Sequence, residues 1–280
     1  MQQVIAFQGE PGAYSEEAVV RFFGEIDGVN RTALPCRTLA AVFDAINRGA
    51  ATDGLIPIEN SLAGSINESY DLLVRNNLQV YGEVILPVNH CLLALPGESI
   101  SEIRRVYSHP QALAQCDQFL NDLGAEAIAS YDTAGSARTL REAGMRGAAA
   151  IASRRAASLY GLAVLAEGIQ TNPSNRTRFY AVGHRSAPRG RRNKTVLVIV
   201  TEHRPGALYW CLGAFAYRQI NMTKLESRPS RGRPWEYVFF LDIDAHVDDP
   251  DCQAALTELK TKASSVRVLG SFPQASDDPA

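Results

Sequence analysis

The chain has 280 residues, of which 46% are hydrophobic and 21% are charged, and 28 basic against 30 acidic side chains give a net charge of −2. This composition is typical of a folded globular protein and excludes disorder of the whole chain. The balanced charge gives no reason to expect nucleic acid or an anionic membrane as a partner. No run of about 18 apolar residues predicts a spanning helix. The first residues lack the regions of a signal peptide, which favours a cytoplasmic location.

The cysteines and histidines show no spacing typical of a metal site. The five cysteines are scattered and none belongs to a C-x-x-C pair. An odd, scattered set of this kind predicts small buried hydrophobic residues rather than a disulfide framework or a zinc site. Motifs for zinc proteolysis, phosphate-binding P-loops and serine hydrolysis are also absent from the sequence.

Short apolar runs alternate with helical patterns over the first 183 residues. Strands are predicted at Val4–Phe7, Gly54–Ile58, Leu78–Leu86, Val88–Leu95, Val106–Tyr107, Glu126–Ala129, Ala148–Ala152 and Thr177–Val182. Helices are predicted at Ser15–Phe23, Leu39–Ile46, Ile66–Val74, Gln111–Leu123, Ala134–Glu142 and Arg154–Tyr160. Three of these helices have N-cap candidates, which are Thr38, Asp132 or Thr133, and Ser153. The alternation predicts α/β layers with a largely parallel sheet.

The pattern changes after residue 183. Residues 184–194 hold Pro, Gly and five Arg or Lys residues with almost no apolar side chain, which predicts a linker that is a solvated basic loop. The elements that follow are expected at Thr195–Val200, Gly206–Gln219, Met222–Leu225, Tyr237–Ile243, Asp251–Lys262 and Val266–Leu269. Their order is β-α-β-β-α-β, the split βαβ arrangement, and residues 273–280 are expected to be a flexible polar tail.

Polar residues follow several predicted strands, at the points where the next segments begin. They are Glu59–Ser61, Ser108–Pro110, Asp132–Thr133 and Ser153. In open α/β sheets ligands bind beyond the carboxyl ends of the strands, and helix N-termini there attract anions. The sequence therefore predicts a cleft for a small anionic molecule, with ordinary helix capping as the alternative interpretation of each position.

Three side chains near these positions could carry chemistry. Arg178 could bind a carboxylate through its planar pair of donors, although an Arg beside a strand is often a surface residue. His109 could act as an acid or base near neutral pH, or could simply bond to the backbone at a helix start. Glu59 could be a general acid if burial raised its pKa, or could form an ion pair.

Six ordered strings resemble prephenate dehydratase and span nearly all of residues 1–183. They are FQGEPGAYSEEA (7–18), GLIPIENSLAGSINESYDLL (54–73), GEVILPVNHCLLALPG (82–97), VYSHPQALAQC (106–116), AAIASRRAASLYGL (149–162) and NRTRF (175–179). The C-terminal part resembles an ACT regulatory domain, because GAL at 206–208 and ESRP at 226–229 match its phenylalanine-binding motifs.

The resemblance implies a catalytic domain over residues 1–183, built as two α/β lobes of the periplasmic-binding-protein kind. It implies a linker at 184–194 and a ferredoxin-like ACT domain at 195–272. The implied reaction converts prephenate to phenylpyruvate, carbon dioxide and water in phenylalanine biosynthesis, without cofactor or metal. L-phenylalanine is the implied feedback effector of a homodimer or homotetramer. No chorismate mutase segment precedes residue 1, so a monofunctional enzyme is expected.

The resemblance also implies roles for individual residues. The essential hydroxyl is that of Thr177, and its hydrogen bond could be relayed from His109 or Glu59. Contacts to the substrate are expected from Asn60, Ser61, Ser108, Thr133, Ser153, Arg178 and Phe179, the last packing against the ring or the core. Phenylalanine is expected at Gly206, Ala207 and Leu208 and at Glu226, Ser227, Arg228 and Pro229. The alternatives are an arogenate dehydratase and a non-catalytic amino-acid-sensing solute-binding protein.

Overall fold

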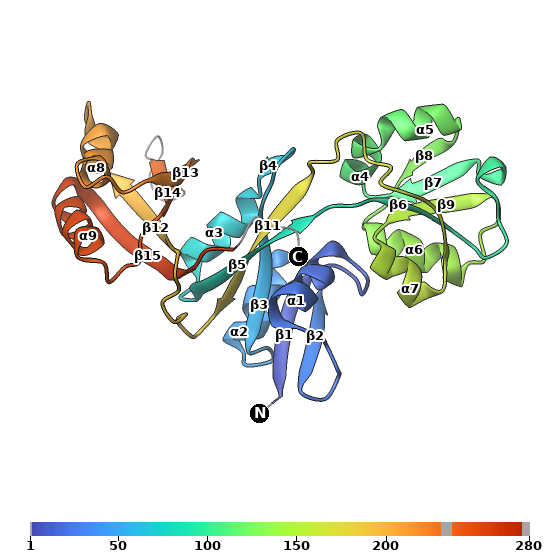
Figure 1. Ribbon diagram of the computed structural model, residues 1–280, viewed down its shortest axis with the longest axis horizontal. Coiled ribbons are helices and arrows are strands. Elements are labelled where there is room, and N and C mark those ends of the chain that lie inside the picture. The colour runs from blue at the N-terminus through green and yellow to red at the C-terminus, as the bar shows by residue number, and fades with distance from the viewer. Residues whose placement is uncertain (1, 231–236, 276–280) are drawn as a thin grey trace. The chain divides into compact units, whose positions relative to one another are not determined.

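The chain folds into two compact units in the computed structural model, which describes residues 2–230 and 237–275 (Figure 1). The first unit comprises Met1–Asn67 and Val84–Phe179, and the second comprises Glu68–Glu83 and Tyr180–Ala280. Two strands, β5 (Gln79–Pro87) and β11 (Arg176–Gly183), run from one unit into the other. This division differs from the predicted domain boundaries, because residues 68–83 group with the C-terminal half of the chain.

The first sheet has the strand order β2-β1-β3-β11-β5, and the short β4 pairs with β3. Its remaining strands are β1 (Gln3–Gln8), β2 (Arg31–Cys36), β3 (Asp53–Asn60) and β4 (Gly64–Ser65). The helices that follow β1 and β2 are α1 (Tyr14–Phe23) and α2 (Leu39–Asn47). β1 runs parallel to both β2 and β3, and the predicted cap Thr38 accepts the N–H of Ala41 at the start of α2.

The second sheet has the order β10-β6-β9-β7-β8. Its strands are β6 (Cys91–Ala94), β7 (Arg105–Ser108), β8 (Glu126–Ala129), β9 (Ala148–Ala152) and β10 (Ala163–Glu167). The connecting helices are η1 (Ile100–Glu102), α4 (Pro110–Gln115), α5 (Asp117–Leu123), α6 (Thr133–Glu142) and α7 (Arg154–Tyr160). β7 is parallel to β8 and β9, but β6 is antiparallel to β9 and β10, so this sheet is mixed rather than largely parallel as predicted.

Three local predictions were incomplete. The helix expected at Gln111–Leu123 is two helices that meet at Cys116, because the carbonyl of Gln115 accepts the N–H of Thr171 at 2.8 Å instead of continuing the helix. Strands β2 and β10 were not predicted at all. Both are edge strands of their sheets. Pro35 weakens the strand signal of β2, whereas β10 is a run of four apolar residues that is too short to distinguish a strand from a helix by its periodicity.

The second unit confirms the predicted βαββαβ order. Its elements are α3 (Asn67–Arg75), β12 (Asn193–Thr201), α8 (Ala207–Ala216), β13 (Met222–Pro229), β14 (Tyr237–Ile243), α9 (Pro250–Lys262) and β15 (Ala263–Pro273). The antiparallel sheet has the order β13-β14-β12-β15, and its apolar side chains share one core with those of α8 and α9. The predicted fold class, a two-lobed α/β domain followed by a ferredoxin-like domain, is therefore confirmed.

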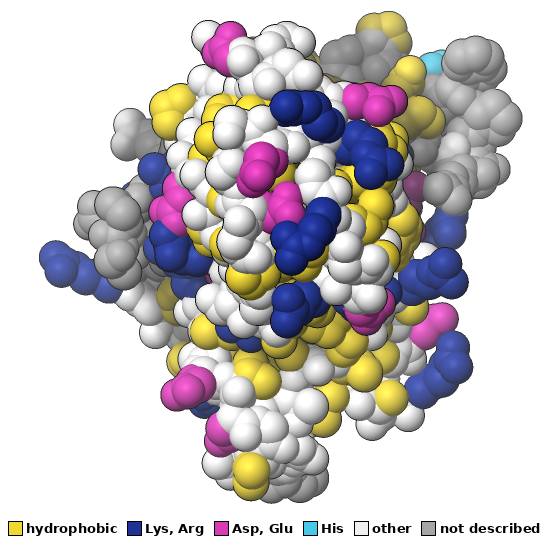
Figure 2. All heavy atoms as spheres, turned by 90° about the vertical axis from the view of Figure 1, so that its right-hand side faces the viewer, with side chains coloured by type: hydrophobic (Ala, Val, Ile, Leu, Met, Phe, Trp, Pro, Cys, Tyr) yellow, Lys and Arg dark blue, Asp and Glu magenta, His cyan; other side chains and the backbone are white. Residues whose placement is uncertain are grey.

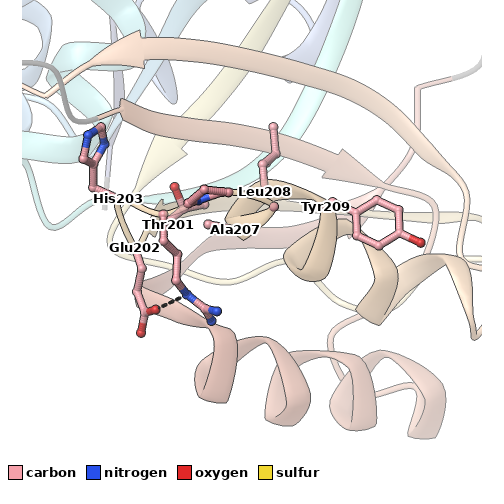
Figure 3. Close-up of a pocket in the computed structure, with 9 residues that line it drawn as sticks. Thr201, Glu202, His203, Ala207, Leu208 and Tyr209 are labelled. Carbon is pink, nitrogen blue, oxygen red and sulfur yellow. Dashed lines mark hydrogen bonds and ion pairs between the residues drawn. The ribbon is translucent and has the colours of Figure 1, made fainter.

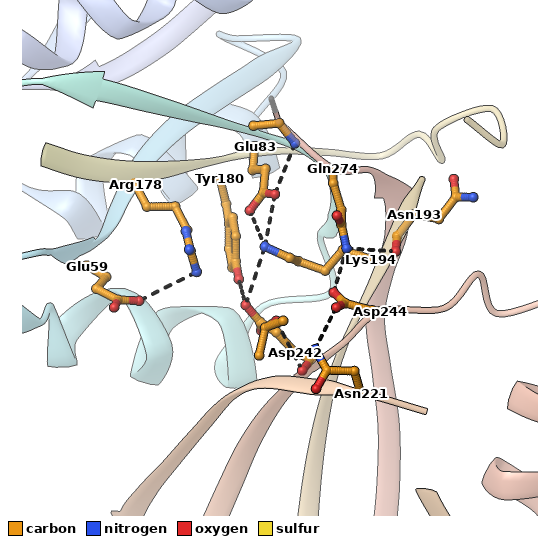
Figure 4. A network of polar contacts seen from close by, with 12 residues as sticks. Glu59, Glu83, Arg178, Tyr180, Asn193, Lys194, Asn221, Asp242, Asp244 and Gln274 are labelled. Atoms are coloured by element: carbon orange, nitrogen blue, oxygen red, sulfur yellow. Dashed lines mark hydrogen bonds and ion pairs between the residues drawn. The ribbon is translucent and has the colours of Figure 1, made fainter. Parts of the chain in front are cut away.

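The predicted linker and tail are partly strand. β12 begins at Asn193, and the next residue, Lys194, is buried with its Nζ 2.7 Å from Glu83 Oε2 and 4.0 Å from Asp242 Oδ2 (Figure 4). The end of the expected basic loop is thus inside the protein, because partners distant in sequence neutralise the ammonium group. Pro273 closes β15 rather than opening a tail, and residues 276–280 lie outside the described residues.

The surface and the cysteines agree with the composition. Figure 2 shows acidic and basic side chains interspersed with apolar groups over the face that it presents. Each of the five cysteines is free and buried, which confirms that they act as small hydrophobic residues. Over the residues that the structure describes, no helix is long and apolar enough to cross a membrane.

One glycine lets two distant strands of the second unit touch through their backbones. A Cβ atom added to Gly270 of β15 would lie 1.7 Å from the carbonyl oxygen of Val80 in β5, closer than any two atoms can approach without a bond. The backbone of Gly270 is not in the left-handed region, so the glycine is required by space rather than by conformation.

We predict that Gly270→Ala lowers the free energy of unfolding by about 3 kcal/mol, because β15 must move away from β5 to admit the methyl group. Gly49→Ala is the matched control: it has a positive φ but nothing within 4 Å of the added Cβ, so it should cost only about 1 kcal/mol. Urea denaturation of both variants measures the difference. An equal loss of unfolding free energy in the two variants would show that the close approach of Gly270 to Val80 does not add to the cost of the substitution.

Candidate active site

Asn60, the last residue of β3, fixes the hydroxyl of Thr177 on the neighbouring strand β11. Its Nδ2 donates to Thr177 Oγ1 at 3.0 Å, to Asn175 Oδ1 at 2.8 Å and to the carbonyl of Arg176 at 3.2 Å. Its Oδ1 accepts the N–H groups of residues 62–63 at 3.1 and 2.9 Å. These contacts determine which way the amide points, and they make Thr177 an acceptor whose own hydrogen stays available to donate.

A chain of buried polar groups continues from Asn175. Asn175 Nδ2 donates to Gln115 Oε1 at 3.0 Å, and His90 Nε2 lies 2.9 Å from the same oxygen. On the other side of the imidazole, the Tyr14 hydroxyl lies 2.8 Å from Nδ1. Because Gln115 Oε1 can only accept, the neutral imidazole carries its proton on Nε2 and Nδ1 is an acceptor. The single hydrogen of the Tyr14 hydroxyl is shared between this nitrogen and the carbonyl oxygen of Asn89, which lies 2.9 Å from the hydroxyl.

Burial sets the protonation states within this chain. Burial raises the pKa of Tyr14 well above its usual value, so the phenol keeps its proton and remains a donor. Burial also lowers the pKa of His90, against the opposing effect of its hydrogen bond to Gln115, so the imidazole is neutral near pH 7. The chain is therefore a set of uncharged groups with assigned donors and acceptors.

Two cavities meet beside these residues, and both are lined by residues of the first unit. The one that contains Thr177 has a volume of about 130 Å³ and is lined by Tyr14, Asn60, Val88, His90, His109, Gln111, Ala112, Gln115, Thr133 and Thr177. The other has about 220 Å³ and is lined by Gln8, Gly9, Ala13, Tyr14, Ser15, His109, Tyr131, Asp132 and Thr133. They share Tyr14, His109 and Thr133, so they form adjoining compartments of one site.

Four of the predicted site residues reach these cavities. Thr177 and Asn60 come from the first sheet, while His109 caps α4 and Thr133 is the first residue of α6. The cap of α6 is Asp132 rather than Thr133, because its side chain accepts the N–H of Gly135. His109 bonds to the backbone at a helix start, because its Nδ1 accepts the N–H of residue 111 at 3.2 Å. Its ring also lines both cavities, as an acid or base of the site would.

Three predicted serines have structural contacts and line neither cavity. Ser108 Oγ is buried and donates to the carbonyl of Ile151 at 2.7 Å. Ser153 Oγ is buried, donates to the carbonyl of Gly12 at 2.7 Å and caps α7. Ser61 Oγ accepts the N–H of residue 176 at 3.0 Å, which ties it to the backbone of β11. Ordinary helix capping and strand contacts account for these three serines, so we assign them no contact with a substrate.

Glu59 and Arg178 are paired with each other rather than with Thr177. Successive side chains of a strand point to opposite faces, so Arg178 and Glu59 face away from the neighbours Thr177 and Asn60 that share the cavity. Arg178 Nη1 lies 3.7 Å from Glu59 Oε2 (Figure 4). The same alternation leaves Phe179 on the side of Thr177 but buried in the core. The expectation that one cleft holds all of these side chains is therefore not met.

Backbone groups supply the positive potential of the site. α1 begins at Tyr14 with Ala13 as its N-cap, and no side chain caps its first N–H groups. α6 begins at Thr133, beside the same cavity. Helix N-termini attract anions, and none of the described residues that line the two cavities is Lys or Arg. Two of the helix starts that the anion-binding prediction invoked thus lie at the cavities, whereas Arg178 does not, and anion binding stays a prediction.

Four residues of the site were not singled out from the sequence: Tyr14, His90, Gln115 and Asn175. All four lie within the strings that carry the family resemblance, so the signal was present in the motifs. No spacing rule could join them, because their hydrogen bonds connect positions up to 76 residues apart. In the described part of the chain, no group of three or more His, Cys, Asp or Glu side chains could hold a metal ion.

The expected effector motifs occupy separate cavities of the second unit. Gly206 is the N-cap of α8 in the left-handed conformation with φ 76°, and a cavity of about 490 Å³ is lined by residues 201–209 (Figure 3). Arg228 and Pro229 instead line a cavity of about 240 Å³ beside α3. The two motifs therefore meet at no single cavity among the described residues of one chain.

Comparison with known proteins identifies the family. The family model for prephenate dehydratase matches residues 5–187, and the chain belongs to this family. Arogenate dehydratase 1 of Petunia hybrida is 44% identical over 96% of the chain and 66% of its own length. Arogenate dehydratase/prephenate dehydratase 1, chloroplastic, of Arabidopsis thaliana is 43% identical over 96% of the chain and 71% of its own length.

Solved structures agree with this assignment. Prephenate dehydratase from Arthrobacter aurescens, in complex with L-Phe, is 32% identical with a TM-score of 0.88, covering 99% of this chain and 92% of that chain. A structure described as "GqqA- a novel type of quorum quenching acylases" is 36% identical with the same TM-score, covering 98% of both chains. The fold of this chain is thus that of the family over nearly its whole length.

The expected cytoplasmic location is contradicted. The Arabidopsis thaliana relatives at 43–44% identity are chloroplastic proteins by name, which does not agree with this expectation. The expectation depended on the composition of the first residues alone, and a targeting address is not a property that the folded domain encodes.

We predict that stability depends on pH through His90. Its pKa is lowered by folding, so its contribution is present above the unfolded pKa of about 6.5 and is lost as the pH falls below it. The free energy of unfolding of the wild type should fall by up to about 1.4 kcal/mol per pH unit more than that of His90→Gln. Urea denaturation between pH 7.5 and 5 measures both slopes, and parallel slopes would contradict the assignment.

Proposed function

We propose that the protein removes the ring carboxylate and the ring hydroxyl of prephenate, or of its amino counterpart arogenate, in the cavity that contains Thr177. The observation that carries this proposal is the hydrogen bond from Asn60 to Thr177 Oγ1, which leaves the hydrogen of this cavity-lining hydroxyl available to donate. The matched family and the curated relatives support this reaction class. Assays with prephenate and with arogenate distinguish the two substrates.

The chemistry needs few groups from the protein. The bond between the ring carbon and the hydroxyl breaks, the ring carboxylate leaves as carbon dioxide, and its bonding electron pair completes the aromatic ring. The departing hydroxide takes one proton and leaves as water. Because aromatisation drives the reaction, the protein has mainly to hold the substrate and to stabilise the negative charge that grows on the leaving oxygen.

Thr177 is the donor that we assign to that oxygen. A Thr hydroxyl is a weak acid in water, but here its oxygen accepts a hydrogen bond from Asn60, which polarises the O–H group. Asn60 is itself held by Asn175, so the donor is oriented before the substrate binds. A preorganised donor of this kind stabilises a developing oxyanion without reorganisation during the reaction.

His109 is the proton source that we assign. Its Nδ1 accepts a backbone N–H at 3.2 Å, so Nε2 carries the hydrogen that the ring can donate. The ring lines both cavities, whereas Glu59 is paired with Arg178 on the other face of the two strands. The side-chain carboxylate of the substrate would bind at the start of α1, where no side chain caps the first backbone N–H groups.

We predict that Thr177→Ala lowers kcat by about 10²–10³-fold with a smaller change in KM, since the hydrogen bond strengthens only as charge develops. Thr177→Ser retains the hydroxyl and should retain most of kcat. Thr139→Ala removes an exposed Thr hydroxyl from α6 and serves as the matched control. The assay follows phenylpyruvate from prephenate and phenylalanine from arogenate. Near-wild-type kcat in Thr177→Ala would remove this residue from the mechanism.

Two other functions are less well supported. A solute-binding sensor would need no oriented donor in its cleft, and turnover of neither substrate together with tight solute binding would favour it. Acylase activity is the description of the GqqA structure. In the described residues no Ser, Thr or Cys that lines either cavity is hydrogen-bonded to a His, the arrangement that activates an acyl-transfer nucleophile.

We further propose that L-phenylalanine regulates the enzyme from the second unit, acting as an ACT domain. Gly206 allows the backbone to come close to a ligand, and the start of α8 can receive a carboxylate. The relative from Arthrobacter aurescens was solved with L-Phe, which supports this effector. Because Arg228 and Pro229 line another cavity, the ESRP segment would reach such a ligand from a neighbouring subunit.

We predict that phenylalanine inhibits the reaction and that Gly206→Ala raises the half-inhibitory concentration about tenfold. The added Cβ would lie 3.2 Å from Trp210 Nε1, and the left-handed backbone disfavours any residue other than glycine by about 1–2 kcal/mol. Gly144→Ala has φ 59° with open space around the added Cβ and is the control for the backbone strain. Each inhibition curve is scaled to its own uninhibited rate. Superimposable curves would contradict the role of Gly206.

A further inference from the structure

Asp132 is the one carboxylate at the candidate active site. Among the described residues that line the two cavities, no other side chain is Asp or Glu and none is Lys or Arg. Asp132 lies in the compartment of about 220 Å³, next to the one that contains Thr177. The carboxylate of Asp132 would repel a dianionic substrate in this cavity. We therefore expect the ligand to carry a positively charged group beside Asp132.

The carboxylate of Asp132 is held rigidly. Its Oδ1 accepts the N–H of Gly135 at 2.7 Å as the N-cap of α6. Its Oδ2 faces Gly9, because a Cβ at this glycine would lie 3.8 Å from that oxygen, and Gly9 has φ 120°, which disfavours any side chain there. The missing side chain leaves room beside Oδ2 in the cavity that both residues line.

The same compartment contains a helix start. It is lined by Tyr14 and Ser15, the first two residues of α1, whose N-cap Ala13 provides no side-chain hydrogen bond. An acid that shares a cavity with an uncapped helix start is complementary to an α-amino acid, with the ammonium group on the carboxylate and the acid group on the helix start. Prephenate carries a ketone at that carbon, and arogenate carries an ammonium group.

We propose that Asp132 is a specificity-determining residue that binds the ammonium group of arogenate, so that the enzyme prefers arogenate to prephenate. This inference rests on the proposed function and names the substrate class of the same site. The ring then lies in the compartment of Thr177 and the amino-acid end lies in that of Asp132. The shared residues Tyr14, His109 and Thr133 lie between the two ends.

The charges around Asp132 favour a cationic ligand group. Glu10 lies near Asp132 and forms an ion pair with Arg138 at 2.8 Å. The positive charge of Arg138 is therefore already neutralised by Glu10. Burial raises the pKa of Asp132, and the charge of Glu10 acts in the same direction, while the backbone hydrogen bonds from Gly135 and Ala134 and the charge of His109 oppose it. An ammonium group would hold the carboxylate in its ionised form, whereas a ketone would give the half-buried carboxylate no cationic partner in the ligand.

The test compares Asp132→Asn with the wild type on both substrates. Asparagine caps helices as well as aspartate does, so α6 keeps its cap while the charge is lost. We expect kcat/KM for arogenate to fall about 10–100-fold, the usual value of a charged hydrogen bond, with kcat/KM for prephenate unchanged or higher. Asp132→Ser, another good cap, repeats the test if the Asn variant folds poorly. Thermal unfolding of each variant establishes that it is folded.

Glu10→Gln is the matched control, because it removes an acidic charge from the same neighbourhood without lining either cavity. Its ratio of arogenate to prephenate kcat/KM should equal that of the wild type. The inference is overturned if Asp132→Asn and Asp132→Ser keep the wild-type ratio, or if the wild type acts on prephenate alone. A wild type that turns over neither substrate overturns the proposed function itself, which separates the two failures.

Discussion

The site depends on the side-chain amide of Asn60, which joins β3 to β11. Its oxygen accepts two backbone N–H groups at the end of β3, and its nitrogen is therefore directed at Asn175 and Thr177. The alternation of side chains along the strands then determines the faces of the neighbouring residues. Thr177 faces the cavity, and Arg178 pairs with Glu59 on the other face of the strands. Strand alternation thus decides that Thr177 is the residue of the TRF segment beside the cavity, and the Asn60 amide holds its hydroxyl oxygen.

The two lobes of the first unit are joined tightly around this site. The loop before α1 packs against α7, where a Cβ on Gly12 would lie 3.0 Å from the Cα of Ala156. Glu16 Oε2 accepts the N–H of Gly12 at 2.7 Å and Nε of Arg155 at 2.9 Å, and these contacts lower the pKa of Glu16 despite its burial. Such contacts make a site whose donors are in place before a ligand arrives, as electrostatic catalysis requires.

The second unit contains a cluster of buried charged side chains. Lys194 is enclosed with Glu83 and Asp242, and the Tyr180 hydroxyl donates to Asp242 Oδ2 at 2.7 Å (Figure 4). A buried ammonium group is tolerated only where partners and hydrogen bonds replace water. Tyr180 belongs to β11, the strand that also carries Thr177, so the same strand contributes to the candidate active site in one unit and to the buried charge cluster in the other.

Local pattern and ordered motifs determined the family, the order of most elements, the cap at Thr38 and the βαββαβ arrangement, because these follow from short-range periodicity and from contiguous residues. The edge strands β2 and β10 and the break at Cys116 escaped prediction, since partners distant in sequence create them. The motifs contained Tyr14, His90, Gln115 and Asn175, but only the tertiary structure joined them into one chain of hydrogen bonds. It also separated Arg178 from Thr177 and brought Asp132 to the cavity, because side-chain direction and long-range packing are properties of the assembled sheets and helices rather than of sequence spacing.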